Sequence, residues 1–267
     1  DIVGLKSLLI PKIISFYNRI INPKKNKVKC MVSGFKLLPS DIMQIEIKFN
    51  NKFEFNPGDY IYLNTSKISI IDWHPFTIIE KVNDNKLLLQ IKVNNQWTKK
   101  LHKRMLETFK IKRKFNQRFE WSFEVDGPYG SKFKESLNSE YLIMVGAGHG
   151  ISKFAPILKD IRQKLKYDKH NIKEIDLHWL VFNQSYFAWF AKILNDFKND
   201  NLGVTFNYHT YFVDKTPDEV NDKLLFISKD VLNERTEIKL IKDLWNGSSF
   251  GSPDWHKELK SKKSKNR

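Results

Sequence analysis

A glycine turn is the clearest arrangement in the sequence of residue types that could do chemistry. It reads Gly146-Ala147-Gly148-His149-Gly150, after the apolar run YLIMV and before the helix-like segment FAPILKDIRQKL. Glycine lets the backbone turn sharply and approach a ligand closely. The N-terminus of the following helix offers N–H groups and the positive end of a dipole to a phosphate. The spacing is G-x-G-x-G, not the usual dinucleotide G-x-G-x-x-G, so a tight turn without a ligand is the alternative to a nucleotide site.

Two residues after the turn bear on the same choice. Ser152 is placed to cap the helix. Lys153 falls in the first helical turn, where a cation opposes the helix dipole. A bound phosphate would offset that cost, so Lys153 favours the nucleotide site.

The composition limits the classes of function. The chain has 267 residues, 41% of them hydrophobic, which suits two globular domains and argues against general disorder. Its single cysteine, Cys30, excludes an intrachain disulfide framework and leaves no pair for a cysteine-based zinc or iron–sulfur site. We find no acid–base pair to propose for catalysis. The net charge of +16 indicates an anionic partner, such as nucleic acid, anionic lipid, a phosphorylated cofactor or an acidic protein.

The positive charge is concentrated in three segments. Residues 1–30, 99–118 and 257–267 together hold 22 of the 46 Lys and Arg residues and 3 of the 30 acidic residues. A nucleic-acid binder needs a basic face on a reading element, commonly with exposed stacking aromatics. Here the basic residues lie in flanking segments and most aromatics lie in strand or helix patterns. We therefore expect no nucleic acid among the partners.

The N-terminal segment 1–26 is apolar and then basic. Lys6, Pro11, Lys12 and Arg19 interrupt it, so no run reaches the ~18 uninterrupted apolar residues of a spanning helix. An apolar stretch followed by a basic cluster suits an interfacial helix, or the cytoplasmic exit of a membrane span lying upstream. An amphipathic helix packed on its own domain is the alternative. Because the chain begins with Asp and not Met, we expect upstream sequence to be missing.

The elements that must position these residues fall into two patterns. From residue 27 to about 125, six short runs rich in β-branched and aromatic residues are separated by turn residues, which predicts an antiparallel barrel or sandwich. A helix is predicted over 99–114. After residue 138, apolar strands alternate with amphipathic helices, which predicts a parallel α/β sheet with crossovers. We therefore predict a β-barrel domain over 27–132 and an α/β domain over 138–267.

Three further motifs, taken in order with the glycine turn, carry a family resemblance. They are Trp73-His74-Pro75-Phe76-Thr77, preceded by PGDY, then DGPYG at 126–130 and GSPDW at 251–255. The chain resembles the cytosolic dehydrogenase domain of the NADPH oxidase and ferric reductase superfamily. The resemblance implies an antiparallel flavin-binding barrel followed by a doubly wound nucleotide-binding α/β domain. It also implies that NADPH passes a hydride to FAD and that FAD passes single electrons to haems in a membrane portion, with dioxygen or ferric iron as the acceptor.

The resemblance also implies roles for individual residues. Phe76 would pack near the isoalloxazine, Thr77 would hydrogen-bond near its reactive nitrogen, and His74 would face the ribityl-phosphate side. In a second flavin segment a basic residue and a threonine reach the pyrophosphate. The residues expected to bind the cofactors are His74, Pro75, Phe76, Thr77, Lys92, Trp97, Thr98, Asp126, Gly127, Pro128, Tyr129, Gly146, Ala147, Gly148, Gly150 and Ser152.

The sequence departs from the family pattern mainly at the nicotinamide nucleotide. Phe182 and Ser252 stand where the family has arginines that suit a 2′-phosphate. NADH use, or recognition of NADPH by another cation such as Lys215, is therefore an open alternative. In the flavin segment Lys92 replaces Arg, and Asn95 replaces Gly. The family's later Cys-Gly-Pro strand end and terminal aromatic are missing, so we expect the second domain to be incomplete, in a fragment or a degenerate member.

The resemblance and the charge together suggest partners and a location. We expect a membrane protein with this domain on the cytosolic side, joined to an upstream haem-bearing transmembrane domain. Anionic lipid of the cytoplasmic leaflet is the expected partner of the N-terminal basic segment, and regulatory protein subunits are further candidates. A non-catalytic flavin- or nucleotide-binding domain of the same fold is the competing function.

Overall fold

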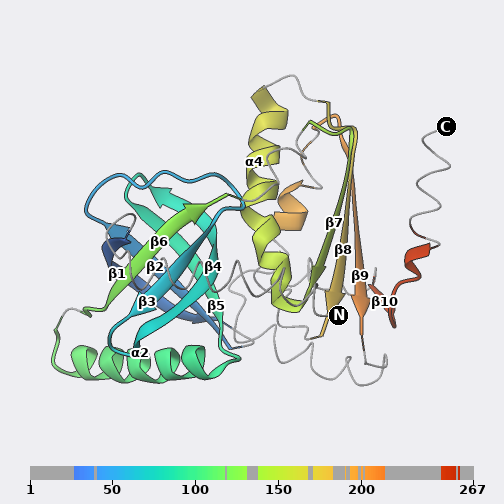
Figure 1. Ribbon diagram of the computed structural model, residues 1–267. Coiled ribbons are helices and arrows are strands. Elements are labelled where there is room, and N and C mark those ends of the chain that lie inside the picture. Colours follow the sequence, from blue (N-terminus) through green and yellow to red (C-terminus); the bar gives the residue numbers. More distant parts are fainter. Residues whose placement is uncertain are drawn as a thin grey trace, which may run out of the picture. The chain divides into compact units, whose positions relative to one another are not determined.

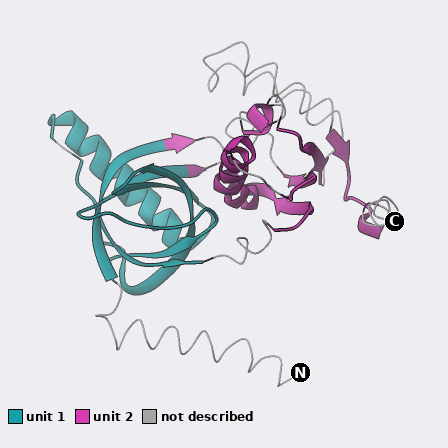
Figure 2. Cartoon of the chain, turned by 90° about the horizontal axis from the view of Figure 1, so that it is seen from above, with its two compact units in different colours: residues 1–36, 43–130 teal, residues 37–42, 131–267 magenta. Residues whose placement is uncertain are grey.

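The structure, a computed structural model, falls into two compact units, residues 1–36 with 43–130 and residues 37–42 with 131–267 (Figure 2). It describes residues 27–38, 41–117, 119–130, 138–167, 171–182, 190, 193–197, 200, 202–213, 248–256 and 258. The predicted membrane-proximal segment 1–26 and a helix-like segment at 236–245 lie outside the described residues.

The first unit is a closed antiparallel barrel with the strand order β1-β2-β5-β4-β3-β6 (Figure 1). Its elements are β1 (Lys27–Leu38), β2 (Ile42–Phe49), β3 (Tyr60–Thr65), β4 (Ser69–Asn83), β5 (Lys86–Lys92), α2 (Gln96–Lys114) and β6 (Ser122–Tyr129). The predicted six-stranded antiparallel fold is confirmed as a barrel, not a sandwich. The predicted helix is confirmed as α2.

Alternation of side chains along the strands fills the barrel. In β5 the residues Leu87, Leu89 and Ile91 are buried, and the residues between them are partly exposed. Side chains of a strand point to opposite faces in turn, so one apolar set faces the interior and excludes water. Each fully buried aliphatic side chain contributes roughly 1.5–3 kcal/mol relative to exposure. Truncating Leu89 to Ala would cost about 2–5 kcal/mol, because a cavity would remain.

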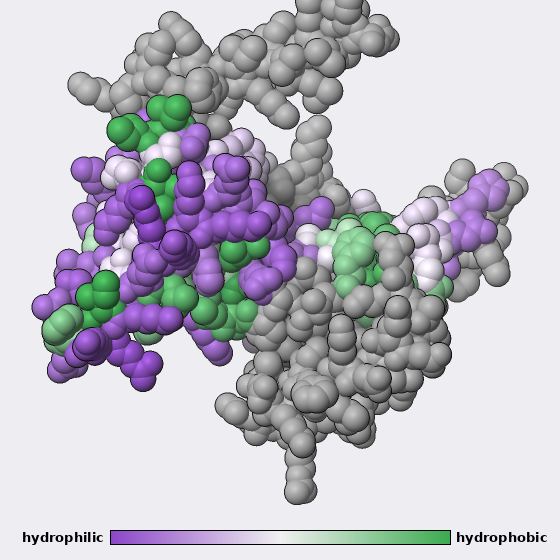
Figure 3. All heavy atoms as spheres, turned by 90° about the horizontal axis from the view of Figure 1, so that it is seen from below, coloured by the Kyte–Doolittle hydropathy of each residue, from purple (hydrophilic) through white to green (hydrophobic). Residues whose placement is uncertain are grey.

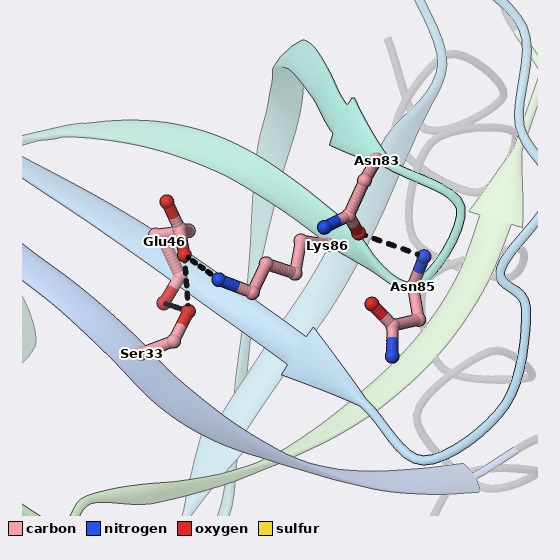
Figure 4. Close-up of polar contacts among 5 residues, drawn as sticks. All are labelled: Ser33, Glu46, Asn83, Asn85 and Lys86. Atoms are coloured by element: carbon pink, nitrogen blue, oxygen red, sulfur yellow. Dashed lines mark hydrogen bonds and ion pairs between the residues drawn. The ribbon is translucent and has the colours of Figure 1, made fainter.

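A polar contact links three neighbouring strands of the barrel (Figure 4). Lys86 on β5 places its Nζ 2.7 Å from Oε1 of Glu46 on β2, and Ser33 on β1 donates to the same oxygen at 2.5 Å. The hydrogen bond from Lys86, then that from Ser33, lowers the pKa of Glu46 below its usual range. At the β4–β5 hairpin the Asn83 side chain accepts a hydrogen bond from the Asn85 amide. These contacts fix the register of the strands outside the apolar interior.

The second unit holds a parallel sheet with the strand order β10-β9-β8-β7. Its elements are β7 (Tyr141–Ala147), the 3-10 helix η1 (Gly148–Lys153), α4 (Phe154–Tyr167), β8 (Glu174–Val181), β9 (Thr205–Phe212) and β10 (Ser248–Phe250). Strand β8 is buried along almost its whole length, as expected for a central strand of a parallel sheet. α4 buries Ile157, Leu158 and Ile161, at the spacing of one helix face. The predicted combination of a barrel and a parallel α/β domain is confirmed.

Candidate functional site

A pocket of about 340 Å³ lies at the N-terminus of α2 in the barrel unit. The residues that line it come from the start of β4, the preceding turn and the first turns of the helix: Ile68, Asp72, His74, Asn95, Gln96, Trp97 and Lys100. Two predicted cofactor residues, His74 and Trp97, therefore meet in one pocket. Lys100, which sequence reasoning did not single out, joins them.

The aromatic side chains at and beside this pocket pack against one another with tilted rings. The His74 ring lies 4.4 Å from that of Trp97, and Phe76 lies 6.0 Å from the same ring. Thr77 and Pro75 belong to the other face of β4, because they pair with Tyr60 and Tyr62 across the ladder and alternate with His74 and Phe76. The structure thus brings together His74, Phe76 and Trp97 and separates them from Pro75 and Thr77.

A capping box builds the start of α2. The Asn95 side chain accepts a hydrogen bond from the Thr98 amide at 2.8 Å, and the Thr98 hydroxyl accepts one from the Asn95 amide at 3.1 Å. This pairing satisfies two amides at the helix end. Thr98 is buried and its hydroxyl serves the cap, so it holds the helix in place instead of lining the pocket. The same pairing gives a physical reason for Asn95 at a position where the family has Gly.

The pocket suits an anionic group. It faces the positive end of the α2 dipole, and the first turn of the helix has no acidic residue. Its lining holds one ammonium group, on Lys100, and one carboxylate, on Asp72. Burial lowers the pKa of His74, and the charge of Asp72 only partly offsets that effect, so the ring is neutral at physiological pH. Lys92 ends β5 four residues before α2 and is not among the residues that line the pocket.

A buried indole gives the strongest indication of a ligand. Trp97 is 5% exposed, and within the described part of the chain its Nε1–H has no hydrogen-bond partner. Leaving a buried donor unsatisfied costs free energy, about 1–3 kcal/mol. Nε1 itself is shielded in this arrangement, so a ligand acceptor would remove that cost once the indole turns its N–H towards the pocket that Trp97 lines. Together with Lys100 and the N-terminus of α2, the residues present fit a phosphate-bearing cofactor.

The DGPYG motif continues strand β6 instead of forming a separate turn. Asp126 and Tyr129 both pair with β3, and the register shifts between Tyr60 and Tyr62. Gly127 lies in this irregularity at φ +133°, a conformation that favours glycine. Tyr129 donates a hydrogen bond to Asp126 at 2.8 Å. The motif is therefore a bulged strand end, because one extra residue of β6 is accommodated opposite β3.

Three tyrosines form an aromatic cluster that sequence reasoning missed. The rings of Tyr60, Tyr62 and Tyr129 lie 5.6–5.7 Å apart. The alternation of Tyr60 and Tyr62 along one strand is a signal that could have placed two of them on one face. Their cross-strand partners are Thr77 and Pro75, so the cluster adjoins the two motif residues that point away from the α2 pocket.

The three glycines of the turn have different roles. A Cβ on Gly146 would lie 2.8 Å from Ile151 Cδ1 and 3.1 Å from Ile151 Cα, so Gly146 allows η1 to pack on β7. Gly148 adopts φ +50°, and its carbonyl accepts a hydrogen bond from the Trp179 indole at 3.1 Å. Apart from its chain neighbours, no atom of the described residues lies within 4 Å of the Cβ position of Gly150. Gly146 and Gly148 build the turn, and Gly150 leaves room for a close approach.

The helix α4 begins at the first residue of the predicted helical segment, so Ser152 and Lys153 precede it. Ser152 is buried within η1, and α4 begins only at Phe154. Lys153 places its Nζ 4.8 Å from the centre of the Phe154 ring, a cation–π contact. This contact accounts for Lys153 without a phosphate, so the lysine no longer distinguishes between the two interpretations of the turn.

The positions expected to select the nucleotide lie after strands of the same parallel sheet. Phe182 directly follows β8 and is 46% exposed, and Ser252 follows β10 and is exposed. Because the carboxyl ends of parallel strands share one edge of a sheet, both belong to the edge that carries the glycine turn. Lys215, the other candidate cation, lies outside the described residues.

Trp255 anchors the GSPDW segment to the sheet. Its ring lies 5.5 Å from His178 on β8 and 6.5 Å from Tyr211 on β9. His178 Nδ1 and the Tyr211 hydroxyl are 3.0 Å apart and buried. Burial raises the pKa of Tyr211 to about 12. The segment that carries Ser252 is therefore held against the sheet.

Comparison with known proteins decides the family. Residues 27–133 match the family model described as an FAD-binding domain, and residues 139–267 match that of the ferric reductase NAD binding domain. The chain belongs to the dehydrogenase domains of the NADPH oxidase and ferric reductase superfamily. Its barrel is thus an FAD-binding domain of this superfamily, and its parallel sheet belongs to the NAD-binding domain.

Members of this superfamily resemble the chain over most of its length. NADPH oxidase 1 of Rattus norvegicus is 26% identical over 95% of the chain, and ferric reduction oxidase 2 of Arabidopsis thaliana is 33% identical over 61%. The chain spans 43% and 22% of these two relatives. The FAD/NAD-binding domain of a Vibrio cholerae nitric oxide dioxygenase has the same fold, with a TM-score of 0.53 and 12% identity over 73% of this chain and 78% of that one. Among the described residues, no helix combines the length and apolarity needed to cross a bilayer.

Proposed function

We propose that the chain is the dehydrogenase module of a transmembrane electron-transfer flavoprotein. The pocket at the N-terminus of α2 binds the phosphate portion of FAD. Lys100 and the helix dipole attract the anion, Trp97 donates its indole N–H, and the rings of His74 and Phe76, which both pack on Trp97, order the neighbouring part of the cofactor. The unpartnered indole of Trp97 is the observation that carries this proposal.

The second unit binds the nicotinamide nucleotide at the carboxyl edge of its sheet. The glycine turn leaves open space beside Gly150, where a phosphate can approach the backbone. FAD, when bound, supplies the redox chemistry: it accepts a hydride from the nucleotide and releases single electrons. The residues of this chain bind and orient the two cofactors. Thr77 is proposed to contact the flavin ring from the face that it shares with Tyr60.

The electrons then pass to haem in a transmembrane domain outside this chain. Dioxygen is the proposed final acceptor, with superoxide or hydrogen peroxide as the product, because NADPH oxidases match most of the chain. Reduction of ferric chelates is the second candidate, which the resemblance to a ferric reduction oxidase and the matched ferric reductase domain favour. The proposed location is the cytosolic side of a membrane, with anionic lipid at the N-terminal segment and regulatory subunits as further partners.

The nucleotide preference is proposed to shift towards NADH. The exposed Phe182 offers no charge to a 2′-phosphate, and Ser252 offers only a hydroxyl. An arginine would make charge-assisted, bidentate hydrogen bonds there. The preference therefore depends on two side chains at the edge of the sheet.

A matched pair of lysine substitutions tests the flavin pocket. Lys100→Gln removes the cation that lines the pocket, and we expect the dissociation constant for FAD to rise about tenfold, in line with ~1.5 kcal/mol for a charged contact. Lys103→Gln removes one charge from the exposed side of the same helix and should leave the dissociation constant for FAD unchanged. The measurement is a fluorescence titration of the whole chain with FAD. Equal affinities in the two variants would contradict the proposed site.

The same titration separates the competing, non-catalytic function. A domain that only binds would take up FAD and NAD(P)H without reducing the flavin. Bleaching of the bound flavin on addition of NAD(P)H would exclude this non-catalytic function.

A further inference from the structure

The outer side of α2 is a stripe of lysines. Lys99, Lys103, Lys110 and Lys114 are exposed and recur at spacings that keep them within one side of the helix, opposite the buried Leu101. Figure 3 views the molecule from the side on which α2 lies in Figure 1, and the barrel unit is mostly hydrophilic there. This lysine stripe is distinct from the pocket, because Lys100 is the one lysine of α2 that lines the pocket.

The charge of the lysine stripe is not balanced within the barrel. Glu107 is the one acidic residue in the sequence of the helix. Among the residues that the structure describes, no carboxylate forms an ion pair with the four lysines. Such a stripe attracts an extended anionic surface more strongly than single ions, because many charges act together.

Exposed apolar side chains lie at the C-terminal end of α2, where the lysine stripe ends. Ile111 and Phe115 are one helical turn apart and are 56% and 64% exposed. Arg104 lies two turns before Ile111 and three before Phe115. It donates a hydrogen bond to the Lys67 carbonyl and so ties the β3–β4 hairpin to the same helix. The same hairpin carries Ile70, which is 81% exposed. Figure 3 shows hydrophobic residues (green) between hydrophilic ones (purple) on this side of the barrel unit.

We propose that the outer side of α2 docks on an anionic lipid bilayer. The lysines reach the headgroups with their ammonium ends, and Ile111 and Phe115 enter the boundary between headgroups and acyl chains. Apolar side chains at the end of a basic stripe match a bilayer, which offers negative charge and hydrocarbon on one surface. Nucleic acid would need stacking aromatics on a reading element, and the one exposed aromatic ring of α2 and its C-cap is Phe115.

This inference rests on the proposed membrane location but not on the flavin chemistry. Its test is sedimentation of the full chain with phosphatidylserine-containing vesicles and with neutral phosphatidylcholine vesicles. The variant Lys99→Gln/Lys103→Gln/Lys110→Gln leaves the N-terminal segment and the pocket intact. We expect it to lower the partition coefficient on the anionic vesicles about a hundredfold, at roughly fivefold per lysine. The matched control, Lys29→Gln/Lys36→Gln/Lys48→Gln, makes the same charge change on β1 and β2 and should lower it much less.

A second variant identifies the kind of surface. Ile111→Gln/Phe115→Gln keeps the charge and should still lower binding to anionic vesicles, about tenfold or more, because the lost apolar burial is large. Equal losses in the two lysine variants would overturn the proposal. A second result would also overturn the bilayer proposal: the α2 lysine variant loses binding while the Ile111/Phe115 variant binds as before. The lysine stripe would then be assigned to an acidic macromolecule. Flavin reduction measured on the same samples shows separately whether the proposed dehydrogenase function holds.

Discussion

The two units present their proposed cofactor contacts in different ways. In the barrel the contacts are side chains, with the rings of His74 and Trp97 and the ammonium group of Lys100 around one pocket. In the sheet unit they are the backbone of a turn, where Gly146 and Gly150 matter because they lack side chains. Cofactor binding at the barrel site should therefore weaken when specific side-chain groups are removed. Nucleotide binding at the turn should weaken when any side chain is added.

This difference also concerns selectivity. The barrel is proposed to bind a cofactor whose identity is common to the superfamily, and its HPFT and DGPYG motifs match the pattern, with departures at Lys92 and Asn95. The sheet edge is proposed to choose between two nucleotides, and there the sequence departs from the pattern at Phe182 and Ser252. Substitutions at the edge should change which nucleotide is used, whereas substitutions at the pocket should change how tightly FAD binds.

Adding a side chain to the turn should have the largest effect. In Gly146→Val the new side chain collides with Ile151, which should destabilise the sheet unit by about 1–3 kcal/mol. Displacement of the turn should slow nucleotide-dependent flavin reduction about a hundredfold. FAD affinity should stay unchanged, because the barrel is not altered. Stopped-flow reduction and FAD titration measure the two quantities.

Gly150→Ala is the control for that collision. Open space surrounds its Cβ position, so the free energy of unfolding should change by less than about 0.5 kcal/mol. The affinity for NAD(P)H should nevertheless fall, because the methyl group occupies the approach to the backbone. Unchanged nucleotide affinity in Gly150→Ala would assign the turn a purely structural role.

Removing one hydrogen-bond donor tests the barrel site. Trp97→Phe keeps an aromatic ring in the core but deletes the Nε1–H, which has no partner among the described residues. We expect FAD affinity to fall about tenfold, the equivalent of ~1.4 kcal/mol for one buried hydrogen bond. Trp121→Phe is the matched control, since its buried indole also has no described partner but does not line the pocket. Equal FAD affinities in the two variants would contradict the role of Trp97.

Adding a charge tests the sheet edge. Phe182→Arg supplies a guanidinium at the carboxyl end of β8, and the ratio of kcat/KM for NADPH over NADH should rise about tenfold through contact with the 2′-phosphate. Phe182→Gln should change this ratio little, because it adds polarity without charge. A ratio that is equal in both variants would show that this position does not meet the 2′-phosphate.

The stabilities of the two units should depend on acid pH through different carboxylates, and this effect is smaller than those above. Hydrogen bonds from Arg162 and then Lys166 lower the pKa of Asp200 to about 2. Because its pKa is lower in the folded state, Asp200 stabilises the sheet unit above its unfolded pKa near 4. That stability is lost as the pH falls towards 2. Asp200→Asn should therefore flatten the acid dependence of β8 hydrogen exchange in this range and leave β5 unaffected.

The corresponding barrel variant completes the comparison. Glu46 also has a lowered pKa, through Lys86 and Ser33, so Glu46→Gln should reduce the acid dependence of β5 exchange and not that of β8. Cross-effects between the two units would show that they do not unfold independently.

The sequence predicted the elements better than it predicted the roles of individual side chains. The alternation in β5 and the helical spacing in α4 are local patterns, so the barrel strands and the parallel unit could be anticipated. The capping role of Thr98 could not, because it depends on a reciprocal bond with Asn95. The bulge at Gly127 and the Tyr129 cluster depend on the register with β3, which no local pattern encodes.

Anaerobic reduction of FAD bound to the whole chain tests the central claim most directly. The purified protein is loaded with FAD and mixed with NADH or NADPH, and the flavin absorbance is followed. The account predicts that the bound flavin bleaches with both nucleotides, that NADH is at least as effective as NADPH, and that Gly146→Val abolishes most of the rate while retaining FAD. A loaded protein whose flavin neither nucleotide reduces would contradict the account.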